Sequence, residues 1–500
     1  MQIPQFSKYF TFENEKRLLF LLLLVTLISR IFLIFYIPLV KDEIIYAENI
    51  HQQIEHPSLE LYLLDQQVTW KPPVFFLVYA PMVNLLQHLP IPFEVAYRLP
   101  TILFSLISIV ALYFVIKNIA SDISISFFTS LIYSLIFLTV YVNSVLLIDT
   151  LNLMFILIAL YFYTSKMPDW KYLIGGLFTI LAFYTKLWIA GLVPILALIW
   201  LYQNHSKSIF NKYFICSLLL LPLAGFFYWF WAPTSQDATP IQIIFDRILM
   251  MDLSIIQLFG SVFPFFLCVN LWIGFGLFGM LKFWKGNLFM FVWALLSILP
   301  ILAAYFMPWY ALPLMVPLAY FSALVLIKMD GKMLVDVFFI IILILLILSG
   351  YILGFFLWEQ RLFDAYIAEK EAGNILAFKE NVTIVGDWAP SVAGYKFLQE
   401  RRELGYYYDF GWMVMEGHNF SLSEIADNYN VAYAGFSNDF MCLYMNTSKL
   451  GCDYKKPSNI TKADYIAVIG YENQTLNDFT LIYNNSNIRI FSRFGSGATD

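Results

Sequence analysis

The sequence predicts an α-helical polytopic membrane protein with a small α/β domain at its C-terminal end. Of its residues, 60% are hydrophobic and only 13% are charged, whereas a soluble chain carries about 25% charged residues. Apolar runs long enough to cross roughly 30 Å of hydrocarbon recur over residues 1–357. Beyond residue 358 the composition shifts to Asn, Tyr, Asp and Ser. A water-soluble globule and a disordered chain are both excluded.

The apolar runs predict about eleven transmembrane helices. The first run, 18–38, lacks the small-residue cleavage site of a signal peptide and is expected to be a retained span. Residues 172–202 are too long for one helix, and we interpret them as two short helices that meet near Lys186. The other predicted spans are 99–116, 124–142, 150–165, 213–232, 254–281, 286–306, 309–328 and 334–357.

The positive-inside rule gives the predicted orientation. With the N-terminus in the cytoplasm, most short loops that carry lysine and arginine face inward. Residues 39–97 then form a long first outer loop with interfacial helices, and the segment after the last span lies outside. That segment carries glycosylation sequons, which fit an extracytoplasmic location, at Asn381, Asn419, Asn446, Asn459, Asn473 and Asn484.

We therefore divide the chain into a transmembrane domain, 1–357, and an extracytoplasmic C-terminal domain, 358–500. Short apolar runs at 383–385 and 465–469 and a helical pattern near 391–402 predict the α/β character of the second domain. The net charge of −5 gives no basic surface for nucleic acid. The four cysteines of the chain lack the spacing of a metal site.

Two adjacent acids, Asp42 and Glu43, open the first outer loop. Tyr46, Ile50 and Ile54 recur at fourfold spacing, which predicts a helix from Asp42 onward. Both acids then lie in its first turn, where the helix dipole favours their ionised form. The pair could be catalytic or could be a solvated capping pair.

Cations follow at two loop-to-helix junctions. Trp70 and Lys71 precede two prolines, and Arg98 stands two residues before a third proline, at the expected start of the second span. Proline is tolerated in a first helical turn because its missing N–H would have no partner there. Each cation could bind an anion or could simply reach the membrane interface beside an aromatic residue.

Asp149 and Lys186 interrupt strongly apolar segments. Charges so close to hydrocarbon are costly and are usually paired or functional. Asp149 could instead cap the N-terminus of the span at 150–165. Lys186 would have to extend from the middle of an apolar stretch, so an anionic partner explains it better.

Acids and cations are thus expected together on the outer side, near the membrane surface. Such a set suits a lipid phosphate combined with a group that must be deprotonated. The cations would stabilise charge on a departing phosphate, and a carboxylate would accept the proton of an incoming hydroxyl.

The ordered series Asp42-Glu43, Lys71-Pro72-Pro73, Arg98-Leu99-Pro100, Asp149-Thr150 and Thr185-Lys186 resembles the glycosyltransferase C superfamily. More narrowly, it looks like the branch of dolichyl-phosphate-mannose–protein mannosyltransferases and lipid A aminoarabinose transferases. The resemblance covers about the first 200 residues and continues more weakly at Pro308-Trp309-Tyr310.

This resemblance implies an inverting transfer of one sugar, a mannose or another hexose, from a polyprenyl- or dolichyl-phosphate donor on the extracytoplasmic face. Asp42 would be the catalytic carboxylate, with Glu43 and Asp149 as further acids of the site. Lys71, Lys186 and Arg98 would bind the donor phosphate. Tyr46 and Trp70 are further candidates. The acceptor would be a hydroxyl on a glycan, protein or lipid. No cofactor is required, although paired acids leave room for a divalent cation.

Some positions differ from the family pattern. Ile45 stands where the aminoarabinose transferases have an arginine, and Trp70 replaces a residue that is often polar or acidic. Both differences argue against lipid A as the acceptor. The WWD-type signature of oligosaccharyltransferases is missing, which favours single-sugar transfer. An oligosaccharyltransferase-like enzyme and a transporter or flippase of lipid-linked sugars remain the alternatives. Transporters tend to carry charges near the bilayer midplane. The charged motifs here are expected at the outer ends of helices, which counts against transport.

Overall fold

The computed structural model describes the residues 14–36, 39, 41–55, 62–63, 66–67, 73–186, 189–231, 271–303, 308–328, 360–377, 379, 382–385, 431–434, 465–469, 480–484 and 488–493. The chain divides into two compact units. The first comprises Met1–Tyr36 and Thr69–Trp358, and the second comprises Ile37–Val68 and Glu359–Asp500. The predicted domain boundary at 357/358 stays a prediction.

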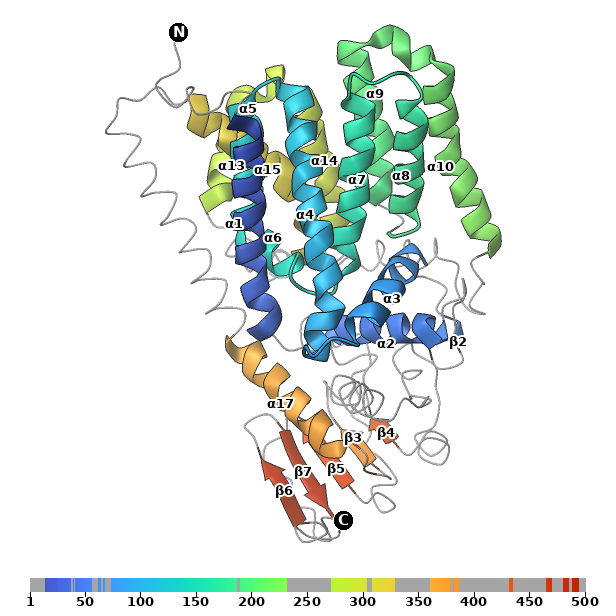
Figure 1. Ribbon diagram of the computed structural model, residues 1–500, viewed down its shortest axis with the longest axis vertical. Coiled ribbons are helices and arrows are strands. Elements are labelled where there is room, and N and C mark those ends of the chain that lie inside the picture. Colours follow the sequence, from blue (N-terminus) through green and yellow to red (C-terminus); the bar gives the residue numbers. More distant parts are fainter. Residues whose placement is uncertain are drawn as a thin grey trace, which may run out of the picture. The chain divides into compact units, whose positions relative to one another are not determined.

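The first unit is a helical bundle that begins with α1 (Glu15–Tyr36), α3 (Val74–Leu86) and α4 (Phe93–Ala120) (Figure 1). Helix α4 packs against α1 and along α7 (Ile148–Thr164). The expectation that Arg98 and Pro100 open the second span is wrong, because α4 begins at Phe93 and contains both residues. Pro92 occupies the N-cap position and Glu94 supplies an acid in the first turn, which favours the earlier start.

The segment predicted as one span over 124–142 is two helices, α5 (Ile123–Leu135) and α6 (Phe137–Val142). Asp122 caps α5 by accepting hydrogen bonds from the backbone amides of Ser124 and Ile125. Near the break, the buried Arg30 of α1 donates from Nη1 to the Ser134 carbonyl at 3.2 Å. Side chains from another helix therefore bind backbone groups that the break leaves without helical partners.

Residues 172–202 form two helices, as the sequence predicts. Helix α8 (Lys171–Phe183) ends just before Lys186, and α9 (Leu192–Asn204) follows after the short 3-10 helix η3 (Ile189–Gly191). A second 3-10 helix, η4 (Ser206–Phe210), leads into α10 (Lys212–Trp231). In Figure 1, α7, α8, α9 and α10 lie side by side.

The later part of the unit contains α13 (Leu271–Phe283), the 3-10 helix η5 (Trp284–Gly286), α14 (Leu288–Ala303), the 3-10 helix η6 (Pro308–Ala311) and α15 (Leu312–Lys328). Helices α13 and α15 approach closely because Gly276 and Gly279 face Leu318 and Phe321. A Cβ atom at Gly279 would lie 2.5 Å from the Phe321 carbonyl oxygen.

Large apolar side chains cover the outer faces of α1 and α10, among them Phe20, Ile28, Leu219 and Phe226. Such faces are expected where a helix borders lipid. Helix α1, over Glu15–Phe35, and α4 are each long and apolar enough to cross a membrane, and the other apolar helices of the described part are shorter. The number of about eleven spans therefore stays a prediction, and the predicted span at 334–357 lies outside the described residues.

The second unit combines helix α2 (Lys41–Glu55) and the strand pair β1 (Tyr62–Leu63) and β2 (Gln66–Gln67) with the C-terminal segment. The predicted helix that starts near Asp42 is confirmed. In the C-terminal segment, α17 (Gln360–Leu376) precedes a sheet with the strand order β4-β3-β5-β7-β6.

This sheet contains β3 (Val382–Val385), β4 (Val431–Ala434), β5 (Tyr465–Ile469), β6 (Thr480–Asn484) and β7 (Ile488–Ser492). Strand β3 pairs in parallel with β4 and β5, whereas β7 pairs antiparallel with β5 and β6. The strands predicted near 383–385 and 465–469 are confirmed. The helix predicted near 391–402 lies outside the described residues.

The glycines of α13 allow a matched test of the α13–α15 contact. Gly279→Ala should lower the free energy of unfolding by about 1–3 kcal/mol, because the added methyl group meets the backbone of α15. Gly274→Ala is the control, since nothing lies within 4 Å of a Cβ atom there. It should raise stability slightly through the higher helix propensity of alanine. Thermal unfolding in detergent measures both, and equal effects would contradict this packing.

Candidate functional site

The candidate site lies at the junction between α8 and α9. Helix α8 ends at Phe183, and Lys186 follows the turn at Tyr184 and Thr185. Its backbone N–H still donates to the Ala182 carbonyl at 2.9 Å. The lysine is therefore anchored by the last turn of α8, while its side chain leaves the helix axis.

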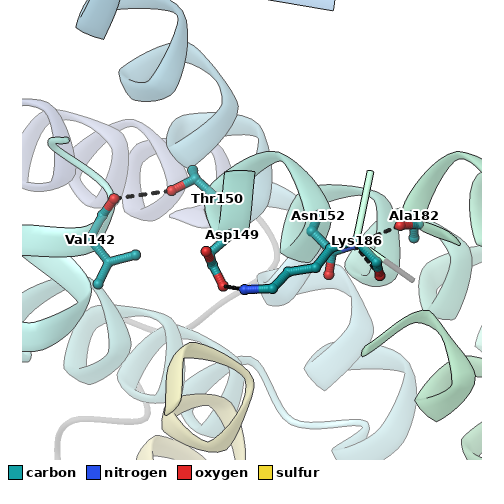
Figure 2. A network of polar contacts seen from close by, with 6 residues as sticks. All are labelled: Val142, Asp149, Thr150, Asn152, Ala182 and Lys186. Atoms are coloured by element: carbon teal, nitrogen blue, oxygen red, sulfur yellow. Dashed lines mark hydrogen bonds and ion pairs between the residues drawn. The ribbon is translucent and has the colours of Figure 1, made fainter. Parts of the chain in front are cut away.

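The Lys186 ammonium forms an ion pair with the Asp149 carboxylate, which lies in the first turn of α7. Nζ and Oδ1 are 2.5 Å apart, and the side chains of Lys186 and Asp149 are only 7% and 3% exposed. Figure 2 shows the lysine side chain extending from the junction toward Asp149. Two residues that the sequence singled out separately thus meet, and each reduces the cost of burying the other's charge.

The ring of Tyr310 is the second partner of this ammonium. Tyr310 belongs to η6, and the Lys186 Nζ atom lies 3.6 Å from its ring centroid. A cation this close to an aromatic face is attracted by the ring quadrupole. Lys186 is thereby bound from two sides by parts of the chain more than a hundred residues apart.

Helix α7 also holds the junction through Asn152. The Asn152 side-chain amide donates to the Ala182 carbonyl at 2.7 Å and to the Lys186 carbonyl at 3.5 Å (Figure 2). Asp149 and Asn152 are three residues apart, so they share one face of α7. The N-cap position of α7 is Leu147. The alternative that Asp149 caps this helix is therefore wrong, because Asp149 is already inside its first turn.

The start of α7 is tied to the end of α6. The Thr150 hydroxyl donates to the Val142 carbonyl at 3.2 Å (Figure 2). It also lies within donating distance of the Asn143 side-chain oxygen, at 2.9 Å. All of these residues are buried. This contact fixes the first turn of α7, and with it the position of Asp149.

The segment that follows Lys71 reaches the same junction. Lys71 and Trp70 lie outside the described residues, but Pro73 is the N-cap residue of α3. The backbone N–H of Val74 donates to the Tyr184 carbonyl at 3.1 Å. The start of α3 is thus joined to the turn that carries Lys186.

Arg98 lies on α4 and is fully buried. Its Nη1 atom donates to the Ile34 carbonyl, near the end of α1, at 3.5 Å. Ile34 of α1 also packs with Val95 and Ile102 of α4 in a cluster of buried apolar residues. The structure therefore brings Arg98 to α1, whereas it brings Asp149 and Lys186 to each other.

The acidic motif, Asp42 and Glu43, belongs to the second unit. Glu43 and Tyr46 lie on the buried side of α2, together with Ala47 and Ile50. Asp42 is in the first turn of the same helix, and its side chain lies outside the described residues. The roles predicted for these residues stay predictions.

Sequence reasoning missed two neighbours of Lys186. Asn152 is an uncharged polar residue in a largely apolar helix. Its position three residues after Asp149 was the signal that could have found it. Tyr310 belongs to the proline-tryptophan-tyrosine pattern, but that pattern does not predict its contact with Lys186. Nothing in the local sequence shows that these two residues meet.

This arrangement holds a cation at the ends of several helices, with an acid, an aromatic ring and an amide around it. Lysine carries its charge as a compact ammonium on a flexible stem, whereas the arginine guanidinium is a rigid fork. A phosphate oxygen could therefore replace part of the present contacts of Lys186. The chemistry that the junction supports best is binding of an anionic head group.

Comparison with solved structures identifies the fold. The chain is similar to the aminoarabinose transferase ArnT from Cupriavidus metallidurans bound to undecaprenyl phosphate, with a TM-score of 0.53 and 12% identity over 95% of this chain and 97% of that one. It is also similar to the oligosaccharyltransferase AglB from Archaeoglobus fulgidus in complex with an inhibitory peptide and a dolichol-phosphate. That match has a TM-score of 0.50 and 11% identity, and it covers 93% of this chain and 70% of that one.

A structure of the Archaeoglobus fulgidus oligosaccharyltransferase tethered to an acceptor peptide gives a TM-score of 0.50 and 11% identity. The match covers 78% of this chain but spans only 64% of that one. No protein-family model and no curated protein matches the sequence. The chain has the glycosyltransferase C fold, a fold of polytopic membrane enzymes, and the resemblance predicted from the motifs is confirmed at the level of the fold.

The buried ion pair can be tested by its effect on stability. Asp149→Ala should lower the free energy of unfolding by about 3–5 kcal/mol, because Lys186 loses its carboxylate partner in a buried position. The double variant Asp149→Leu/Lys186→Met should lose much less, since an apolar pair of similar volume needs no charge compensation. Denaturant unfolding in detergent measures both. A double variant as unstable as Asp149→Ala would argue against this coupling.

Proposed function

We propose that this protein is a membrane glycosyltransferase that takes a sugar from a polyprenyl-phosphate-linked donor and transfers it to an acceptor hydroxyl. The single observation that carries the proposal is the buried Lys186 ammonium, bound between Asp149 and Tyr310 at the α8–α9 junction of a glycosyltransferase C fold. Charged side chains inside membrane bundles are rare and commonly mark the sites at which ions or substrates bind.

Lys186 and Lys71 bind the donor phosphate in this proposal, with Arg98 as a further cation of the same end of the bundle. The hydrogen bond from Val74 to the Tyr184 carbonyl supports a joint role, because it connects the segment after Lys71 to the turn before Lys186. Asp149 pairs with Lys186, so its role is to hold that ammonium rather than to accept a proton from the acceptor. Both lysines stabilise the charge that develops on the leaving phosphate.

Asp42 is the proposed general base, and Glu43, Tyr46 and Trp70 are further proposed residues of the reaction. The acceptor oxygen forms a new bond to the anomeric carbon as the bond from that carbon to the phosphate oxygen breaks. The electron pair of the broken bond leaves with the lipid phosphate, and the hydroxyl proton goes to the Asp42 carboxylate. Displacement from the opposite face inverts the anomeric configuration. A mannose or another hexose on a dolichyl or other polyprenyl phosphate is the proposed donor.

An oligosaccharyltransferase-like activity is the second candidate, and a specific observation favours it. The similarity to the Archaeoglobus fulgidus oligosaccharyltransferase is nearly as high as that to ArnT. The missing WWD-type signature supports single-sugar transfer instead. We propose that transfer occurs on the extracytoplasmic face, that the N-terminus is cytoplasmic and that the acceptor is a glycan, protein or lipid.

The proposed base has a direct test. Asp42→Asn should lower the rate of sugar transfer by about 10²- to 10⁴-fold, because the amide cannot accept the proton of the acceptor hydroxyl. Binding of undecaprenyl phosphate should stay unchanged, since the lipid phosphate contacts other residues. Purified enzyme with a radiolabelled polyprenyl-phosphate hexose measures the rate. Transfer at the wild-type rate would refute this role for Asp42.

Reconstituted protein separates the proposed activities. Incubation with a polyprenyl-phosphate hexose should yield an acceptor whose mass rises by one hexose. A separate incubation with a lipid-linked oligosaccharide should leave the acceptor unchanged. A product that gains a whole glycan would establish the oligosaccharyltransferase alternative. Label that crosses the vesicle membrane without attachment to an acceptor would establish a transporter or flippase.

A further inference from the structure

We infer that Asn152 is a positioning residue that directs the Lys186 ammonium toward the donor phosphate. The inference rests on the proposed function, because it takes Lys186 as a ligand of the lipid phosphate. Asn152 is not expected to touch the substrate itself. Its side-chain amide acts on the backbone that carries Lys186.

Asn152 contacts Ala182 in the last turn of α8 and Lys186 just after that helix ends. The amide donates to the Ala182 carbonyl at 2.7 Å, and the same carbonyl accepts the backbone N–H of Lys186 at 2.9 Å. It also donates to the carbonyl of Lys186 itself at 3.5 Å. An amide nitrogen has two hydrogens, so one side chain can serve both acceptors. The position at which the lysine leaves the chain is thus bound to α7.

Helix α7 consequently holds Lys186 at two points. Asp149 contacts the end of the side chain at Nζ, and Asn152 contacts the backbone at its base. A lysine side chain has four flexible carbons and loses rotamer entropy when it is ordered. Attachment of both ends to one rigid helix places the ammonium before the phosphate arrives, so that binding need not include this ordering cost.

A purely structural role would leave a different signature. Asn152 is almost fully buried, and a buried amide needs hydrogen-bond partners in any case. If it served only to satisfy buried groups, its loss would lower stability whether or not Lys186 were present. A positioning role makes its effect on lipid-phosphate affinity depend on Lys186.

A double-mutant cycle with undecaprenyl phosphate, which carries no sugar, distinguishes these roles. Asn152→Leu should weaken its binding by between about 10- and 100-fold, the range found when residues that orient metal ligands are removed. In a Lys186→Met background the same change should have no further effect, because there is no ammonium left to direct. Asn152→Ala is measured in the same cycle in case the leucine variant does not fold.

Thr164→Val is the matched control. Thr164 is also buried on α7, but it lies at the opposite end of the helix, where its hydroxyl donates to the Leu160 carbonyl at 2.8 Å. This variant should bind undecaprenyl phosphate like the unaltered protein. A fold-change from Asn152→Leu that is equal with and without Lys186 would overturn the positioning role alone. If Lys186→Met leaves the affinity unchanged, the proposed phosphate role of Lys186 fails, and the positioning role fails with it.

Discussion

The structure at the α8–α9 junction depends on one constraint, the burial of a positive charge in an apolar helical bundle. The Lys186 side chain is 7% exposed, and an ammonium in such a place must be offset by partners. The Asp149 carboxylate offsets its charge and the Tyr310 ring covers another side. These partners come from α7 and η6, so the charge fixes how distant parts of the chain meet.

The same end of the bundle gathers polar contacts because several helices begin or end there. Helix ends leave backbone N–H and carbonyl groups without helical partners. Here the Tyr184 carbonyl accepts from the Val74 N–H that opens α3, and the Val142 carbonyl at the end of α6 accepts from Thr150. These bonds run between helices rather than within one, so they hold the ends in register. The proposed donor, a phosphate head group on a long isoprenoid chain, would need such a polar end on an apolar bundle.

Much of this arrangement could be predicted, and the exceptions have physical causes. The interruption of 172–202 was predictable because a lysine inside an apolar stretch marks a helix end. The earlier start of α4 was not predicted, because a proline such as Pro100 is also typical of a first helical turn. Pro92 and Glu94 mark the actual start. The break between α5 and α6 falls at Ile136, so neither glycine nor proline indicates it in the sequence. Arg30 from another helix donates a hydrogen bond to the Ser134 carbonyl beside the break. The pairing of Asp149 with Lys186 and the position of Tyr310 depend on tertiary packing, which local sequence does not encode.

The ion pair bears on function because stability alone does not explain it. Buried ion pairs can often be replaced by apolar residues of similar volume at little or no cost in stability. Helices α7 and α8 already pack closely through apolar residues such as Phe155 and Phe178, whose ring centroids are 6.0 Å apart. Their association therefore does not need a charge. In the proposed function this lysine binds the donor phosphate, and the aspartate beside it holds the ammonium in place when that phosphate is absent. On that proposal, the buried pair forms the phosphate site before the donor arrives.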